Sequence, residues 1–236
     1  CCYDIPRLRR IRRVGKPDFS LKPLASLFAA CFPLFISSFL AIYLGNVCKY
    51  AIDAVGTAEM QTIFNVLFMP SFVINLFVNF FIRPSLTHMA ELWLKREVRA
   101  FMKTIVKLLG AVVGVTLFVV VGCIIVGIPI LEAFYGIDLE GCLPALLILL
   151  FGGGFLSASV VFFNAMVIIR AQNGVLVGYV LGIVIAQLIA TPFVVAAGVM
   201  GASVAYAISC AGLLLCFVLV FAWSARVRMK KWGSWS

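Results

Sequence analysis

Six apolar stretches divide this chain, and each has the roughly 20 residues that a helix needs to cross the ~30 Å hydrocarbon core of a bilayer. They cover residues 24–46, 62–82, 104–131, 145–168, 174–197 and 199–222. With 64% hydrophobic and only 12% charged residues, the chain is too apolar for a soluble domain of this length. The sequence therefore predicts an all-α polytopic membrane protein whose core is a six-helix transmembrane bundle.

The basic residues predict how these helices are oriented. When the stretches are threaded through a membrane in alternating directions, all but one of the 19 Lys and Arg residues fall on the same side, the exception being Lys49. The positive-inside rule assigns that side to the cytoplasm. We therefore expect both termini to be cytoplasmic, with residues 1–23 as a basic linker, 24–222 as the bundle and 223–236 as a basic tail.

The same charges bear on partners and chemistry. A net charge of +10 raises nucleic acid as a partner, but the charge is divided among separate loops, which favours topology and contact with anionic headgroups. We therefore expect no nucleic-acid partner. His88 is the only histidine, and no CxxC or Cys/His cluster is present. We expect no catalytic residues, no metal and no cofactor, and hence a protein that is not an enzyme.

The second apolar stretch carries the most unusual pattern. Ser71, Asn75, Asn79 and Arg83 recur every four positions, which places them along one slowly drifting helical face from mid-bilayer to the cytoplasmic edge. Beyond this stretch, residues 85–103 alternate polar and apolar side chains at helical spacing, which predicts an amphipathic helix lying in the membrane interface.

Small residues at helical spacing predict a contact between the last two stretches. They are Gly178, Gly182, Ala186 and Ala190 in one stretch, and Gly198, Ala202, Ala205, Ser209 and Gly212 in the other. Small faces allow helix backbones to approach closely in lipid. We expect these two helices to pack on each other.

Four segments also carry a resemblance to a known family. They are NVCKYAID at 46–53, LFMPSFVINLFVNFFIRPSLTHMAELW at 67–93, GIPILEAFYGIDL at 127–139 and VMGASVAYAIS at 199–209. In order and spacing they resemble the carboxy-terminal half of the bacterial lipid-linked oligosaccharide flippases, members of the multidrug/oligosaccharidyl-lipid/polysaccharide exporter superfamily. The similarity extends over residues 16 to 223. Relatives usually have Pro before the Lys-Tyr pair, where this chain has Cys48; the helix is therefore expected to continue here.

The resemblance implies a function and a partner half. It implies translocation of a polyprenyl-pyrophosphate-linked oligosaccharide across the bacterial cytoplasmic membrane for surface polysaccharide synthesis. This chain would supply helices seven to twelve and pair with an amino-terminal six-helix half, with a polysaccharide polymerase and glycosyltransferases as further partners. Such a substrate needs cations for its diphosphate and amides for its sugars. The candidate substrate-binding residues are Arg83, Asn79, Asn75, Lys49, Asn46, Asn164 and Arg170.

Several alternatives stay open. Arg83 and Arg170 can serve as topology charges, Lys49 as an interfacial lysine, and the asparagines as bonds between helices. At the level of function, the alternatives are a cation-coupled multidrug or toxin exporter of the same superfamily and a non-transporting membrane subunit of a glycan synthase. A cation exporter should place acidic groups inside the membrane, whereas all nine Asp and Glu lie in loops or near the ends of apolar stretches.

Overall fold

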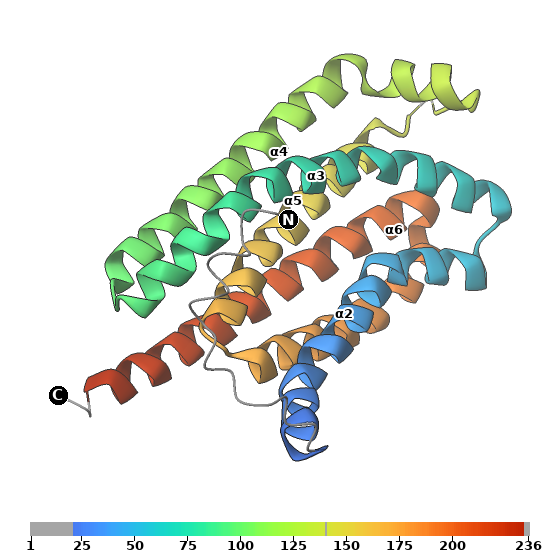
Figure 1. The fold of residues 1–236 in the computed structure, drawn as a ribbon. Helices are drawn as coiled ribbons and strands as arrows, with labels where there is room; N and C mark the ends of the chain where they lie inside the picture. Colours follow the sequence, from blue (N-terminus) through green and yellow to red (C-terminus); the bar gives the residue numbers. More distant parts are fainter. Residues whose placement is uncertain (1–20, 140, 234–236) are drawn as a thin grey trace, which may run out of the picture.

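The computed structural model describes residues 21–139 and 141–233, and within them the chain is helical apart from short connections (Figure 1). The helices are α2 (Leu21–Val55), α3 (Ala58–Leu94), α4 (Val98–Tyr135), α5 (Leu143–Ile168) and α6 (Gln172–Gly233). All five are long and apolar enough to cross a membrane. The predicted all-α architecture is therefore confirmed, with five helices that are long and apolar enough to span a membrane.

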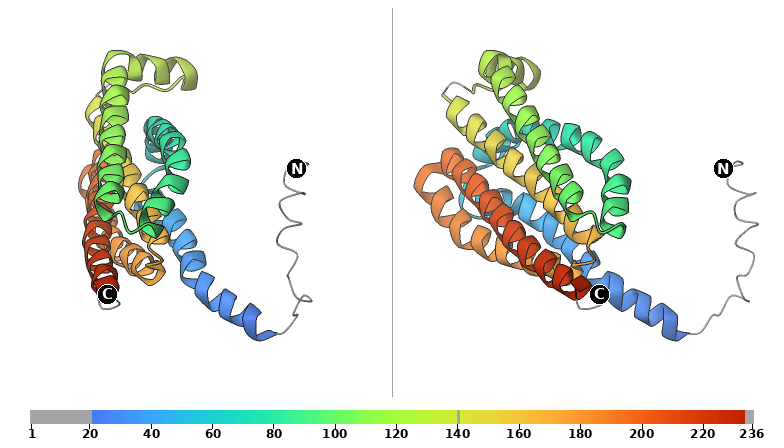
Figure 2. Two further views of the ribbon diagram at one scale, coloured as in Figure 1. Left: turned by 60° about the vertical axis from the view of Figure 1, so that its left-hand side comes forward. Right: turned by 90° about the vertical axis from the view of Figure 1, so that its left-hand side faces the viewer.

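Helix α6 contains the last two predicted stretches, joined by a reversal of the chain. The backbone leaves helical geometry at Ala197 (φ −141°, ψ 17°) and at Gly198 (φ 56°, ψ −130°). Figure 2 shows the chain folding back within α6, so that its two limbs run side by side. Gly201 is essential to the turn, because a Cβ there would lie 1.8 Å from the carbonyl oxygen of Phe193.

The two limbs of α6 pack on each other, as their small residues predicted. A Cβ added to Gly178 would lie 2.4 Å from the ring of Phe217, and one added to Gly182 would lie 3.0 Å from Leu213. The partner number falls as the glycine number rises, which is the register of an antiparallel pair. Large side chains of the second limb therefore fill the space that the glycines of the first leave open.

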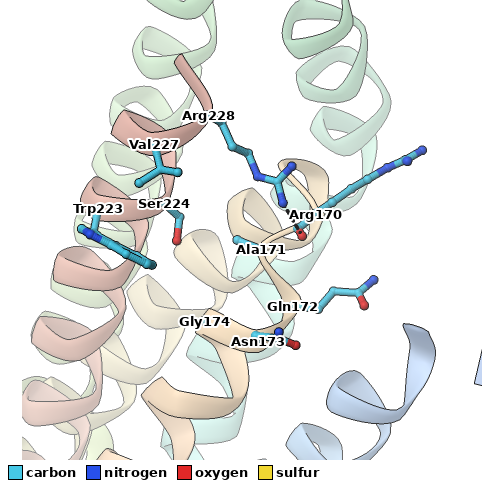
Figure 3. A pocket seen from close by; sticks show the side chains of 9 residues that line it. All are labelled: Arg170, Ala171, Gln172, Asn173, Gly174, Trp223, Ser224, Val227 and Arg228. Atoms are coloured by element: carbon cyan, nitrogen blue, oxygen red, sulfur yellow. Dashed lines mark hydrogen bonds between the residues drawn. The ribbon is translucent and has the colours of Figure 1, made fainter. Parts of the chain in front are cut away.

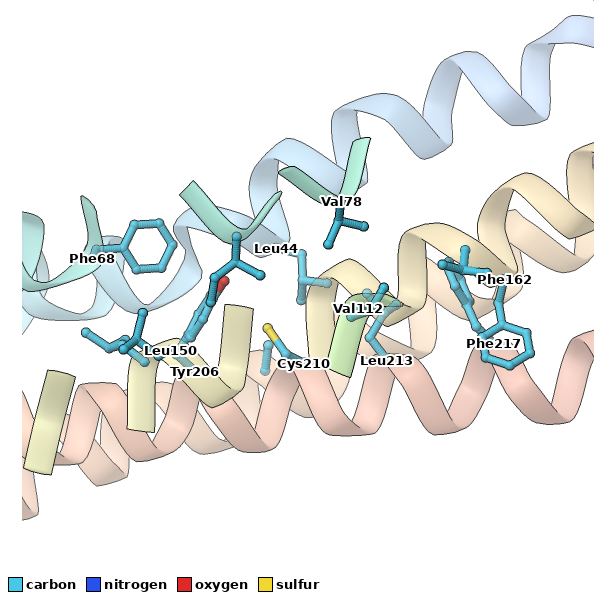
Figure 4. Packing of buried hydrophobic residues seen from close by; sticks show 14 of the residues in the cluster. Leu44, Phe68, Val78, Val112, Leu150, Phe162, Tyr206, Cys210, Leu213 and Phe217 are labelled. Atoms are coloured by element: carbon cyan, nitrogen blue, oxygen red, sulfur yellow. The ribbon is translucent and has the colours of Figure 1, made fainter. Parts of the chain in front are cut away.

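Helix α5 is the central helix, and three successive glycines set its contacts. A Cβ on Gly152 would lie 2.7 Å from Tyr206 of α6, one on Gly153 would lie 3.1 Å from Ser71 of α3, and one on Gly154 would lie 2.9 Å from Thr116 of α4. Each of the three glycines thus lies at the contact between α5 and a different neighbouring helix. The buried side chains around α5, Tyr206 among them, form one continuous apolar core (Figure 4).

The turns that follow α3 and α5 have the same construction. Arg96 and Arg170 both adopt a left-handed conformation, with φ of 60° and 58°. In each turn the next residue donates its N–H to a carbonyl five residues earlier, Glu97 to Leu92 and Ala171 to Met166. This is the Schellman motif that commonly ends helices, although glycine is the usual residue at the left-handed position.

The prediction of one interfacial helix over residues 85–103 is wrong. Residues 85–94 are the end of α3, and residues 98–103 are the beginning of α4. The left-handed backbone at Arg96 breaks the helix between them. The amphipathic pattern arises because the two helix ends expose basic side chains while Met89 and Phe101 are buried.

Helix α2 begins the bundle and continues past the predicted end of its apolar stretch. It runs to Val55 without interruption, so the helix continues through Cys48 and Lys49 as the absence of proline predicted. Pro33 lies inside α2, and Figure 1 shows the helix changing direction in its amino-terminal part. The Ser37 hydroxyl donates to the carbonyl of Pro33 at 2.6 Å.

The two ends of the bundle differ in charge. Figure 1 shows the α3–α4 turn, the α5–α6 turn and the end of α6 at one end of the bundle, with the α2–α3 turn, the α4–α5 connection and the α6 reversal at the other. Among the described helices and turns, Lys49 is the one basic residue near the second end. The separation of charge inferred from the sequence is thus present in the fold.

Candidate functional site

The polar face of α3 borders an open groove of about 510 Å³. Its polar lining residues are Asn75, Asn79 and Arg83, and its apolar lining residues are Phe72, Val73 and Leu76. All six come from α3, so the groove is a concavity on the outer surface of that helix. The structure therefore brings three of the predicted binding residues into one site.

Ser71 was predicted to belong to this face, but it has a different role. Its side chain is buried, and its hydroxyl donates to the carbonyl of Leu149 in α5 at 3.1 Å. The close approach of Gly153 to the same serine shows how tightly α3 and α5 meet here. Ser71 is a contact between helices, and the open part of the polar stripe begins at Asn75.

The two asparagines bond to each other along α3. The Asn79 side-chain amide donates to the backbone carbonyl of Asn75 at 2.8 Å and also to the Asn75 side-chain oxygen. Both bonds stay within one helix, and both residues are half-buried. The pair therefore presents joined amide groups to the groove, which can donate to and accept from hydroxyl groups.

The contact made by Lys49 indicates which neighbouring helix lies beside the polar face of α3. Its Nζ lies 4.9 Å from the centre of the Phe68 ring, a cation–π contact between α2 and α3. Phe68 is seven residues before Asn75, so the two share one face of α3. The asparagine pair therefore lies on the flank of α3 on which α2 is found.

Helices α2 and α3 diverge along this flank. Figure 1 shows them leaving a common turn and separating toward the basic end of the bundle. Lys49 lies near the narrow part of the resulting wedge, and Arg83 lies toward its wide part. Fifteen residues separate Phe68 from Arg83, a helical rise of about 22 Å. The two cations thus stand at different depths beside one polar path.

Arg83 itself is exposed and belongs to the continuous helix α3. Its guanidinium carries five donors in a planar fork that matches the oxygens of a phosphate group. The aromatic and aliphatic neighbours in the groove, Phe72 and Leu76, are exposed as well. The site therefore combines a cation, two amides and apolar surface, a set suited to an amphipathic anion.

Lys49 and three other predicted residues do not line this groove. Asn46 in α2 donates its side-chain amide to the Ile42 carbonyl, and Asn164 in α5 donates to the Val160 carbonyl, both at 2.8 Å and both within their own helix. Asn164 is eleven residues after Gly153, so it lies on the α3-facing side of α5. Arg170 is in the α5–α6 turn, beside a separate cavity.

Sequence reasoning missed the residues that accompany Arg170. The guanidinium Nη2 of Arg228 donates to the Arg170 carbonyl at 2.7 Å, and Ser224 is buried beside them. No sequence pattern links these positions, because 58 residues separate the two arginines. The only available signal was that both lie at ends of apolar stretches.

The described residues contain no group of three His, Cys, Asp or Glu side chains that could hold a metal ion. Cys48 and Cys142, which lie near the same end of the bundle, are both free thiols. Burial, and then the nearby carboxylates of Asp138 and Glu132, raise the pKa of the Cys142 thiol. This thiol is therefore less ionised at neutral pH than an ordinary cysteine.

Comparisons with protein-family models, with curated proteins and with solved structures found no match for this chain.

Proposed function

We propose that this chain is half of a flippase that moves a polyprenyl-pyrophosphate-linked oligosaccharide across the bacterial cytoplasmic membrane. The observation that carries the proposal is the grouping of Asn75, Asn79 and Arg83 in one groove on the α2 side of α3. No covalent chemistry is needed for this function. The polar groups of the substrate must be held while they cross ~30 Å of hydrocarbon, where an unpaired charge costs at least a few kcal/mol.

The chemistry of the groove supports this substrate class. The Arg83 fork suits a diphosphate, and the joined amides of Asn75 and Asn79 suit sugar hydroxyls. Exposed Phe72 and Leu76 provide apolar surface for the adjoining lipid chain. Lys49 adds a second cation further along the path, where its contact with Phe68 fixes its direction.

The positions of the acidic residues favour an anionic substrate over a cationic drug. The described acidic residues lie in the first or last turn of a helix or in a connection, and none lines the groove; they are Asp53, Glu59, Glu91, Glu97, Glu132 and Asp138. A carrier of amphipathic cations should place carboxylates beside its path. We therefore rank the multidrug exporter below the flippase.

The proposed mechanism requires a second bundle and a defined orientation. The groove is open on the surface of α3, so a six-helix partner half would supply the opposite wall of the cavity. The basic end of the bundle faces the cytoplasm under the positive-inside rule. Six spans result when the two limbs of α6 each cross the membrane. Rocking of the two bundles would then expose the path alternately to each side.

The substitution Arg83→Lys tests the proposal. The variant is tested in cells that also express the partner half. This change keeps the positive charge and the ability to reach the membrane surface, but removes the planar fork. We expect export of the glycan to fall at least about tenfold, the effect of losing roughly 1.4 kcal/mol from a charge-assisted bidentate contact. The measurement is surface polysaccharide per cell at matched membrane levels of the protein.

Arg99→Lys is the matched control, because Arg99 is also exposed but lies in the first turn of α4, outside the groove. It should leave export unchanged. Wild-type export from the Arg83→Lys chain would mean that Arg83 acts only as a topology charge, and the diphosphate-binding role would then be rejected.

A further inference from the structure

A second cavity, of about 310 Å³, lies where the α5–α6 turn meets the last turns of α6 (Figure 3). Its lining comes from two parts of the chain that are distant in sequence. These are Arg170, Ala171, Gln172, Asn173 and Gly174 from the turn and the start of α6, and Trp223, Ser224, Val227 and Arg228 from near its end. This cavity is separate from the groove on α3 and shares no residue with it.

The cavity is basic and partly preorganised. Arg228 donates through Nη2 to the carbonyl of Arg170 at 2.7 Å, and this bond fixes the guanidinium at the cavity edge. Most of its remaining donors are left for a ligand. No lining residue is acidic. Figure 3 shows the Arg170 side chain directed away from this space, so the cation at the cavity is Arg228. A guanidinium with no opposing carboxylate in the lining is suited to an anion.

Ser224 gives independent evidence that the cavity takes a polar ligand. Ser224 is only 8% exposed and lines the cavity, and within the described part of the chain its hydroxyl has no hydrogen-bond partner. Figure 3 shows this hydroxyl directed into the space between α6 and the turn. A hydroxyl that faces the cavity and makes no other hydrogen bond can donate to a bound anion.

The start of α6 adds further donors. The first N–H groups of a helix have no partner within it, and those of Gln172 and Asn173 belong to residues that line the cavity. The helix dipole at this end favours negative charge. Arg170 holds its left-handed backbone conformation at a position where glycine would be less strained.

The position of the cavity indicates where the anion comes from. A turn of three residues between two apolar helices, α5 and α6, must lie at a membrane surface. Trp223, at the cavity edge, is 69% exposed, as expected for an aromatic side chain at headgroup level. Basic pockets between helix ends at this depth are suited to lipid headgroups.

We propose that this cavity binds the phosphate group of an anionic phospholipid of the surrounding membrane, with Arg228, Ser224 and the first N–H groups of α6 as its main ligands. Such a site would hold the α5–α6 turn against the end of α6 from the membrane surface. It does not depend on the flippase proposal, because the groove on α3 takes no part in it.

Fluorescence of Trp223 provides a direct test. The full 236-residue chain, with the other three tryptophans changed to Phe, is reconstituted in phosphatidylcholine nanodiscs. Brominated phosphatidylglycerol is then compared with brominated phosphatidylcholine as a quencher. We expect phosphatidylglycerol to quench preferentially, and Arg228→Gln to weaken its apparent affinity about fivefold or more, the effect of one basic group near a charged membrane.

Arg226→Gln is the matched control, because Arg226 is two residues away and exposed but does not line the cavity. Equal loss in both variants would show only general surface charge and would overturn the proposal. Asn173→Asp is a second test variant that should fold normally, because an acidic residue in the first turn of α6 stabilises the helix. It should reduce phosphatidylglycerol quenching with unchanged thermal stability, and retention of full quenching would count against the site.

Competition identifies the source of the phosphate. Inorganic phosphate at millimolar concentration should not displace the brominated lipid. Displacement would assign the cavity to soluble phosphate and overturn the lipid assignment. Farnesyl diphosphate should displace no better than unlabelled phosphatidylglycerol. Clearly stronger displacement would assign the cavity to a polyprenyl diphosphate instead of a membrane phospholipid.

Discussion

The side-chain amide of Asn79 donates to the backbone carbonyl of Asn75 at 2.8 Å, so both ends of this bond lie in one helix. A bond of this kind does not join α3 to a neighbour. We therefore predict that Asn75→Leu and Asn79→Leu change the thermal unfolding midpoint in detergent very little while they abolish glycan export. Differential scanning fluorimetry and an export assay on the same variants test this.

Ser71 provides the contrast, because its hydroxyl bonds to the Leu149 carbonyl in α5. Ser71→Ala should cost about 1 kcal/mol of stability, the usual net contribution of such a bond, and should leave the groove unchanged.

Cysteines at Asn75 and Asn79 should react with small hydrophilic thiol reagents, whereas cysteines at buried Ile74 and Val78 should not. The opposite order of reactivity would mean that the asparagines have a structural role.

Gly152 and Gly114 should respond in opposite ways to the same substitution. A Cβ at Gly152 would lie 2.7 Å from the buried ring of Tyr206, whereas nothing lies within 4 Å of one at Gly114. Gly152→Ala should destabilise the bundle by about 1–3 kcal/mol through overpacking. Gly114→Ala should be neutral or stabilise it by up to ~1 kcal/mol, because alanine favours the helix. Thermal unfolding of both variants in one detergent measures the difference.

The separation of charge between the two ends predicts which residues are accessible from outside the cell. On a background without native cysteines, a cysteine at Glu59, near the α2–α3 turn, should react with a membrane-impermeant maleimide in intact cells. A cysteine at Arg99, beside the α3–α4 turn, should react only after the cells are opened. Labelling of position 99 in intact cells would contradict the orientation proposed here.

The thiol of Cys142 should react slowly at neutral pH, because its pKa is raised by burial and then by the carboxylates of Asp138 and Glu132. A raised pKa leaves less thiolate, the reactive form, at any pH below it. Asp138→Asn removes one of the charges and should lower the pKa, so maleimide labelling at pH 8 should become faster. Glu59→Gln removes a charge at the same end of the bundle and serves as the control. An unchanged rate in the Asp138 variant would rule out this electrostatic effect.

Local patterns predicted much of this structure. Lengths of apolar sequence predict helices, because every backbone polar group must be satisfied within the membrane. Recurrence every four residues placed Asn75, Asn79 and Arg83 on one face, as observed. Small residues at helical spacing in the last two stretches likewise predicted the contact between the two limbs of α6.

Features that depend on distant parts of the chain could not be read from these patterns. Ser71 shares the polar period, but its burial is decided by where α5 lies. The bond from Arg228 to Arg170 depends on the reversal at Gly198, which returns the end of α6 to the turn where that helix begins. The break at Arg96 was missed because an arginine in a left-handed conformation carries no sequence signal comparable to glycine.

The wedge between α2 and α3 has a mechanical consequence. The helices are joined at Gly56 and Thr57 and are also held together by the contact of Lys49 with Phe68, so a change in their angle would have its fulcrum near that end. Arg83 lies on a lever arm of about 22 Å measured from Phe68. A tilt of about 5° would therefore change the width beside Arg83 by roughly 2 Å, within the range of packed helices that shift past one another. The gap beside the guanidinium would thus be the dimension most sensitive to any tilt, while the lysine end would keep nearly constant width.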